Sequence, residues 1–196
     1  MDLDFGKDIV LENERVLIRP LVSKDIEHLL NVATEDKDLN RFSPVQIYSP
    51  ELLTQYIENG LKERHNDLRY PFIIFDKKFN AYAGCTSFLN ISNKDKRLEI
   101  GSTWIGNRFQ KTGLNSNCKF LLMSYAFDHL GFERVELKTD ERNVKSRKAI
   151  EKTGGKFEGI LRSHTVMSDG FRRNTVYYGI LSEEWKVLKT QFRVQE

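Results

Sequence analysis

The chain has no long apolar run and little cysteine. No stretch of its 196 residues approaches the ~20 apolar residues that a membrane-spanning helix needs, so we expect no membrane span. The first residues lack the basic region followed by an apolar region that marks a signal peptide. Cys85 and Cys118 both lie in apolar patterns, and we interpret them as reduced core residues rather than reactive thiols. These absences favour a cytoplasmic location.

Neither sign of charge predominates strongly, with 31 Lys and Arg residues against 28 Asp and Glu residues and a formal net charge of +3. No basic run or basic patch with interleaved aromatic residues is present, which argues against nucleic-acid binding. No Cys or His cluster has metal-ligand spacing, so no metal is predicted. The length favours one domain. We place that domain at 14–185, after a lead-in at 1–13 and before a C-terminal helix or tail at 186–196.

The most informative stretch runs from residue 99 to residue 130. It reads as a strand through Ile105, a short polar loop from Gln110 to Asn115, and a helix that is apolar on most sides and therefore central. Free N–H groups at a helix start can bind phosphate. Gly113 permits a close approach or a positive φ, and Lys111 adds a mobile charge. An ordinary connecting loop is the alternative interpretation.

The rest of the chain alternates strand and helix patterns. Strands are expected over residues 15–19, 70–75, 82–91, 97–105, 134–139, 156–164 and 172–181. Helices are expected from the N-caps Ser23, Ser49 and Asn143, and a last short helix from Ser182. The three central strands suggest an antiparallel meander, and the strand–helix–strand order that follows suggests a parallel pair.

The loop Gln110-Lys111-Thr112-Gly113-Leu114-Asn115 resembles the Gln/Arg-x-x-Gly-x-Gly/Ala pyrophosphate loop of the GCN5-related N-acetyltransferases (GNAT). Asn115 departs from the pattern, and an Asn there resembles the branch that includes the ribosomal-protein N-terminal acetyltransferases. Segments 134–139, 143–146 and 158–162 extend the resemblance, which covers roughly residues 16–185. It implies an α/β (α+β) single-domain acyl-CoA N-acyltransferase fold, with a mixed, mostly antiparallel sheet flanked by helices.

The resemblance also implies acetyl-CoA as the cofactor. Backbone groups of the loop would hold its pyrophosphate, and the strand before the loop, with Trp104 and Ile105, would pair with its pantetheine arm. Asn143 would contact that arm and Ser146 would lie beside the sulfur. From the residues alone, Trp104 could equally fill the core, and Asn143 could simply cap a helix.

Acetyl transfer from a thioester to an amine requires a proton acceptor and stabilisation of the departing thiolate. We hypothesise that the Ser146 hydroxyl donates a hydrogen bond to that thiolate. Glu99 and His164 are the candidate bases, because resembling proteins often carry a carboxylate near Glu99 and histidine changes charge near neutral pH. The alternatives are a solvent-facing Glu99 and a structural His164.

The leading interpretation is an acetyl-CoA-dependent N-acetyltransferase that acts on a primary amine by direct attack in a ternary complex. The acceptor could be a protein N-terminus or a small amine. The alternative is a non-catalytic acyl-CoA sensor with the same fold. The sequence leaves monomer and homodimer both open.

Overall fold

The computed structural model describes residues 1–192, so the end of the expected tail at 186–196 lies outside the described residues. One eight-stranded sheet runs through the molecule in the order β1-β2-β3-β4-β5-β6-β8-β7. The strands are β1 (Leu11–Glu12), β2 (Val16–Pro20), β3 (Arg69–Asp76), β4 (Ala81–Ser92), β5 (Arg97–Ile105), β6 (Arg134–Asp140), β7 (Lys156–Val166) and β8 (Arg172–Leu181). Only β5 and β6 pair in parallel, which confirms a mixed, mostly antiparallel sheet.

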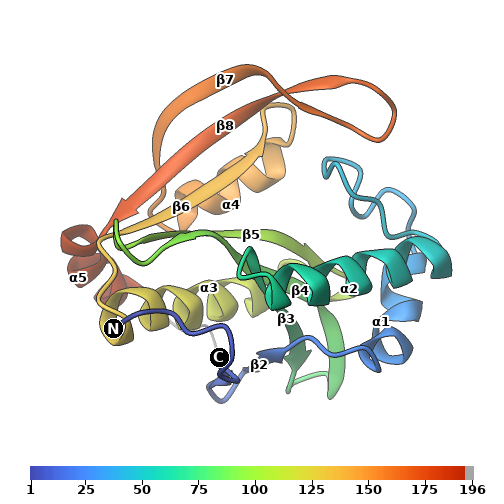
Figure 1. Ribbon diagram of the computed structural model, residues 1–196, viewed down its shortest axis with the longest axis horizontal. Coiled ribbons are helices and arrows are strands. Elements are labelled where there is room, and N and C mark those ends of the chain that lie inside the picture. Colours follow the sequence, from blue (N-terminus) through green and yellow to red (C-terminus); the bar gives the residue numbers. More distant parts are fainter. Residues whose placement is uncertain (193–196) are drawn as a thin grey trace.

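Five α-helices flank the sheet in the described residues (Figure 1). They are α1 (Asp25–Thr34), α2 (Pro50–His65), α3 (Leu114–Ser124), α4 (Val144–Lys152) and α5 (Ser182–Gln191). Two predicted caps are confirmed. Ser49 accepts the Leu52 N–H at 3.3 Å, and Asn143 accepts the Ser146 N–H at 3.0 Å.

The predicted cap at Ser23 is wrong. Helix α1 begins at Asp25 without a side-chain cap. The Asp25 carboxylate instead accepts the Val22 N–H at 2.8 Å and forms an ion pair with Arg19 at 2.6 Å. This buried carboxylate joins the first turn of α1 to β2, and that pairing across six residues sets where the helix starts.

Helices α2 and α3 cover opposite faces of the sheet. Neighbouring residues of a strand point to opposite faces, and Ser87 and Phe88 of β4 show the two directions. Ser87 accepts a hydrogen bond from Arg69, whose guanidinium also bonds Tyr56 of α2. Phe88 stacks on Tyr125, which follows α3. A π-helical turn, Tyr125–His129, continues α3 toward Gly131, whose φ of +68° supports the predicted helix end there.

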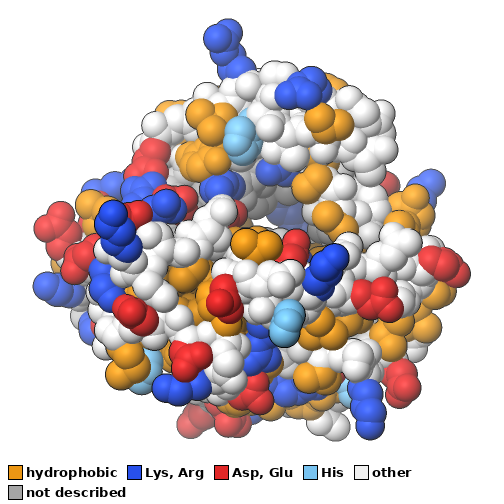
Figure 2. All heavy atoms as spheres, viewed as in Figure 1, with side chains coloured by type: hydrophobic (Ala, Val, Ile, Leu, Met, Phe, Trp, Pro, Cys, Tyr) orange, Lys and Arg blue, Asp and Glu red, His pale blue; other side chains and the backbone are white. Residues whose placement is uncertain are grey.

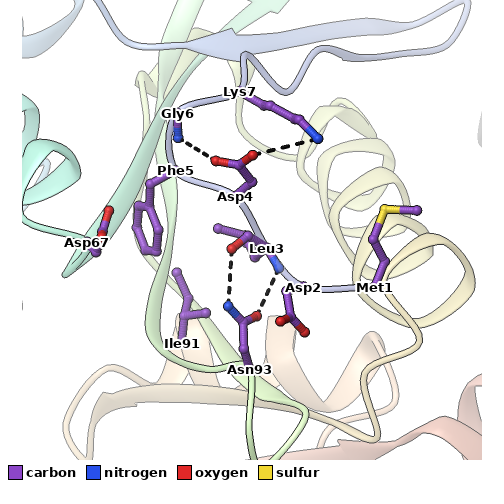
Figure 3. Close-up of a pocket in the computed structure, with 10 residues that line it drawn as sticks. All are labelled: Met1, Asp2, Leu3, Asp4, Phe5, Gly6, Lys7, Asp67, Ile91 and Asn93. Atoms are coloured by element: carbon purple, nitrogen blue, oxygen red, sulfur yellow. Dashed lines mark hydrogen bonds and ion pairs between the residues drawn. The ribbon is translucent and has the colours of Figure 1, made fainter.

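The first residues pack against the turn between β4 and β5 (Figure 3). The Leu3 N–H donates to Asn93 Oδ1 at 2.9 Å, and Asn93 Nδ2 donates back to the Leu3 carbonyl at 3.2 Å. Leu3 and Ile9 are buried. The lead-in therefore contributes apolar contacts to the core. Among residues 1–192, no helix combines the length and the apolar character needed to cross a membrane.

Candidate functional site

Strands β5 and β6 separate and open a cleft. Their parallel pairing joins only Arg97–Glu99 to Arg134–Glu136. Beyond that point, residues of both strands line a cleft of about 1150 Å³. Figure 1 shows β6, β7, β8 and α4 on one side of the separation and β5 with α3 on the other. Figure 2 shows the surface hollowed beneath the arch of β7 and β8, with Lys and Arg side chains around the hollow.

A β-bulge in β5 shapes the wall of this cleft. Ser87 of β4 faces Gly101, whereas Cys85 faces Trp104, so β5 carries an extra residue between them. Ser102 has a φ of +48° at this point. A bulge leaves one residue unpaired and re-aims the side chains beside it. The residues from Gly101 to Ile105 all line the cleft as a result.

The loop before α3 presents free backbone donors. Lys111 and Gly113 have φ values of +62° and +87°. Within residues 1–192, the backbone N–H groups from Lys111 to Ser116 donate no hydrogen bond. Lys111, Gly113, Asn115 and Ser116 line the cleft. Successive free N–H groups at a helix N-terminus suit an anion such as a pyrophosphate.

Side chains hold this loop from several directions. Gln110 Nε2 donates to the Ile105 carbonyl at 2.7 Å, and the Thr112 hydroxyl donates to the Phe109 carbonyl at 2.7 Å. Arg15 forms a buried ion pair with Asp76 of β3 and also donates to Thr112 Oγ1 at 3.3 Å. The loop conformation is therefore fixed by Arg15 just before β2, by β3 and by the end of β5.

Asn115 supplies a second indication that the loop is built for a ligand. Its side-chain oxygen is buried and has no hydrogen-bond partner among the described residues. Buried polar atoms are rarely left unpaired, and this one belongs to a residue of the cleft wall. An amide oxygen accepts hydrogen bonds, so it fits a donor group of a ligand whose anionic group meets the free N–H groups.

The start of α4 forms the facing wall. Asn143 caps the helix through the Ser146 N–H, which confirms its structural role, and both residues line the cleft. Lys145 donates to Gln110 Oε1 and so connects α4 to the α3 loop. The structure thus brings together two helix N-termini, at Leu114 and Val144, that lie far apart in sequence.

Glu99 lies where β5 and β6 part. It is 8% exposed, so the solvent-facing alternative is wrong. Its Oε2 atom is 2.7 Å from Lys138 Nζ and 2.6 Å from Asn90 Nδ2. Burial opposes the charge of Lys138, but the Glu99 carboxylate outweighs it and raises the pKa of Lys138. A Cβ at Gly101 would come within 2.8 Å of Glu99, so this glycine leaves room for the carboxylate.

His164 reaches the same cleft from β7. Leu161 faces Thr175 and Thr165 faces Arg173, so β7 bulges between them, and Ser163 has a φ of +52°. His164 Nδ1 lies 3.1 Å from the hydroxyls of Thr165 and Thr175. Its ring is exposed at the cleft margin. The structure therefore places Glu99, Ser146 and His164 around one cleft.

Trp104 and Ile105 line the cleft although both are largely buried. Trp104 packs edge-on against Tyr56 of α2 at 6.3 Å between ring centroids. Its indole N–H has no hydrogen-bond partner among residues 1–192. Trp104 thus fills the core with one edge and forms the cleft wall with another, so the two interpretations of this residue are compatible.

Comparison with known proteins identifies the family to which the chain that forms this cleft belongs. Residues 15–156 match the profile described as an acetyltransferase (GNAT) domain. The chain belongs to the GNAT acetyltransferase family. A curated Bacillus subtilis (strain 168) relative, named "Putative ribosomal N-acetyltransferase YdaF", is 27% identical over 179 residues, which cover 89% of this chain and 95% of the relative.

Solved GNAT structures share the architecture. A GCN5-related N-acetyltransferase from Brucella melitensis superposes with a TM-score of 0.86 at 26% identity, over 95% of this chain and 85% of that chain. A ribosomal-protein-S5-alanine acetyltransferase from Vibrio fischeri gives a TM-score of 0.72 at 19% identity, over 91% of this chain and 99% of that chain, which shows a shared fold.

This GNAT domain also has cleft residues that sequence patterns did not select. Tyr56 and Arg69 reach the cleft from α2 and β3, and Lys119 reaches it from α3. Burial lowers the pKa of Lys119 to about 8. Lys119 is the only charged residue between Leu114 and Phe127. A single charge inside an apolar helix is a signal that could have identified it.

Proposed function

We propose that this GNAT protein transfers an acetyl group from acetyl-CoA to a primary amine, either a protein N-terminus or a small amine. The observation that carries the proposal is the run of free backbone N–H groups from Lys111 to Ser116, which opens onto the cleft between β5 and β6. The loop from Gln110 to Asn115 would hold the pyrophosphate. Trp104, Ile105 and Asn143 would border the pantetheine arm. Bound acetyl-CoA supplies an activated acyl group.

The roles of the other residues follow from their surroundings. Ser146 lies in the first turn of α4, and its hydroxyl is free to donate a hydrogen bond to the departing thiolate. Glu99 would accept the proton of the acceptor amine, either directly or through water. Lys138 Nζ lies 2.7 Å from this carboxylate and holds it in position.

His164 is the second candidate base. Its Nδ1 atom contacts two hydroxyl groups, which leaves Nε2 as the ring nitrogen able to meet an acceptor. Loss of activity in Glu99→Gln with retention in His164→Gln would support Glu99, and the reverse would support His164. Both variants keep an amide of similar size in place of the titrating group.

Release of free thiol from acetyl-CoA tests the activity. The acceptors would be peptides with different N-terminal residues, a polyamine and an aminoglycoside, with an N-acetylated peptide as the blocked control. Acceptor-dependent thiol release would support the transferase. Tight acetyl-CoA binding without release by any acceptor would instead support the acyl-CoA sensor with this fold.

A cytoplasmic location, a monomeric or homodimeric state and independence from metal and nucleic acid remain predictions from the sequence. The domain limits 14–185 are also retained as a proposal. Limited proteolysis and light scattering on the purified chain would test the limits and the oligomeric state.

A further inference from the structure

Lys119 is a buried cation in the wall of the cleft. Its residue is 7% exposed, yet its side chain lines the space between β5 and α3. Among residues 1–192, no carboxylate lies within 4.0 Å of its ammonium group. Within the described part of the chain, the ammonium group makes one long hydrogen bond, at 3.4 Å to Thr103 Oγ1. Buried charges are normally paired, because an unpaired charge loses its hydration without compensation.

The groups around Lys119 do not satisfy it. Thr103 Oγ1 is already 2.8 Å from Thr86 Oγ1 of β4, so the two hydroxyls bond each other. Cys118, on the same helix, has its pKa raised by burial and is a neutral thiol. Glu99 is the carboxylate whose field reaches Lys119, but Lys138 holds it at 2.7 Å. Of Lys119 and Lys138, which both line the cleft, Lys138 is therefore paired with a carboxylate and Lys119 is available.

The position of the free ammonium group suggests what it meets. Thr103 sits in the β5 bulge, directly before Trp104 and Ile105, which the proposed function assigns to the pantetheine arm. An acyl-CoA whose pantetheine arm lies along Trp104 and Ile105 would carry its acyl group near Thr103. An apolar acyl pocket would need no ammonium group there, whereas an oxygen atom would satisfy it.

We propose that Lys119, with Thr103, forms a binding site for an oxygen atom of the acyl group that the donor carries. The proposal rests on the proposed function, because it takes acyl-CoA as the donor. The oxygen is either that of the thioester carbonyl or that of a carboxylate further along the acyl chain. Both are acceptors for the same ammonium group, and a comparison of donors separates them.

Calorimetry with CoA, acetyl-CoA and succinyl-CoA tests the site. Wild-type protein should bind an acyl-CoA roughly tenfold or more tightly than CoA, as expected for a hydrogen bond to a charged group. Tighter binding of both thioesters identifies the carbonyl oxygen, and tighter binding of succinyl-CoA alone identifies a distal carboxylate. Lys119→Met should remove the preference and leave CoA affinity unchanged. Lys186→Met, on the exposed side of α5, is the matched control.

Two results would overturn the site. An acyl preference that is equal in wild-type and Lys119→Met protein contradicts the role of Lys119 alone. Failure of the wild-type protein to bind CoA in any form contradicts the proposed function and the site with it. The two failures are distinct, because CoA binding is measured separately from the preference for the acyl group.

If Lys119→Met does not fold, a measurement on the wild-type protein still tests the site. Nuclear magnetic resonance of Nζ-labelled lysine would follow the protonation of Lys119 in the wild-type protein. Its midpoint should lie near pH 8 in the free protein, because burial lowers the pKa of Lys119 to about 8. Acyl-CoA should move it to higher pH and CoA should not. An equal midpoint with both ligands would contradict the site.

Discussion

Glu99 Oε2 and Lys138 Nζ lie 2.7 Å apart at the point where β5 and β6 stop pairing. Both residues line the cleft, and the ion pair fixes the position of the Glu99 carboxylate. Lys138 also lies 4.7 Å from the centroid of the Tyr177 ring, so its ammonium group is held from both sides. The proposed base is therefore held in a fixed position.

Replacement of Lys138 tests whether this ion pair matters. Without the cation, the buried Glu99 carboxylate loses the partner that fixes its position. In Lys138→Met, kcat should therefore fall roughly tenfold, with little change in the affinity for acetyl-CoA. Lys138→Arg keeps the positive charge and should restore most of the original rate. An equal kcat in all three proteins would mean that the pair of Glu99 and Lys138 does not serve the reaction.

Replacement of Gly113 tests whether the loop before α3 binds the pyrophosphate. Its φ of +87° suits glycine, and alanine there costs about 1–2 kcal/mol of backbone strain. If the loop relaxes, the N–H groups turn away from the anion, so Gly113→Ala should weaken CoA binding roughly tenfold. Gly170 has a φ of +82° at the β7–β8 turn and carries the same strain outside the cleft. Equal CoA affinities for Gly113→Ala and Gly170→Ala would contradict the loop assignment.

Replacement of Ser146 tests whether its hydroxyl stabilises the departing thiolate. A lost hydrogen bond to a charged group should lower kcat of Ser146→Ala roughly 10- to 100-fold, with little change in the affinity for acetyl-CoA. Ser168, exposed in the β7–β8 turn, gives Ser168→Ala as a control with unchanged kcat. If Ser146→Ala turns over at the wild-type rate while it binds acetyl-CoA normally, Ser146 does not serve the leaving group.

The buried pair of Arg15 and Asp76 tests how the loop is supported. Asp76 is fully buried, and one of its carboxylate oxygens has no hydrogen-bond partner among the described residues. Arg15→Met would leave this charge unpaired and should lower the free energy of unfolding by about 3–5 kcal/mol. The double variant Arg15→Met with Asp76→Leu should recover much of that loss in urea unfolding. A double variant as unstable as Arg15→Met would show that packing, not charge, is responsible.

Lys119 makes stability depend on pH. Burial lowers its pKa from 10.5 to about 8, so between these values the unfolded chain binds more protons than the folded chain. Stability therefore rises with pH across this window. Relative to Lys119→Met, wild-type protein should gain about 3 kcal/mol between pH 7 and pH 11. A difference between the two proteins that stays constant over that window in urea unfolding would contradict the unpaired lysine.

Most of the fold could be predicted from sequence because local patterns agreed with tertiary structure. Ser49-Pro50 and Asn143 marked helix starts, and the alternation of Val135, Leu137 and Thr139 marked a strand buried on one face. Ser23 failed as a cap because Asp25 is held by Arg19 from β2. A contact between different elements decided that boundary, and no local pattern contains it.

The site was predictable only in part for the same reason. The loop from Gln110 to Asn115 is contiguous, so its residues could be named together. The pairing of Glu99 with Lys138 depends on the register and divergence of β5 and β6. The role of Lys119 depends on the fact that Lys138, and not Lys119, forms the ion pair with Glu99. Neither relationship follows from spacing along the chain.

Calorimetric titration of the purified protein with acetyl-CoA, with ATP and NAD as controls, tests the central claim most directly. The cradle of free N–H groups at α3 and the cleft beyond it predict one acetyl-CoA per chain with micromolar affinity. ATP and NAD, which carry phosphates but no pantetheine arm, should bind far more weakly. Folded protein that does not bind acetyl-CoA, or that binds all three equally, would contradict the assignment of this cleft.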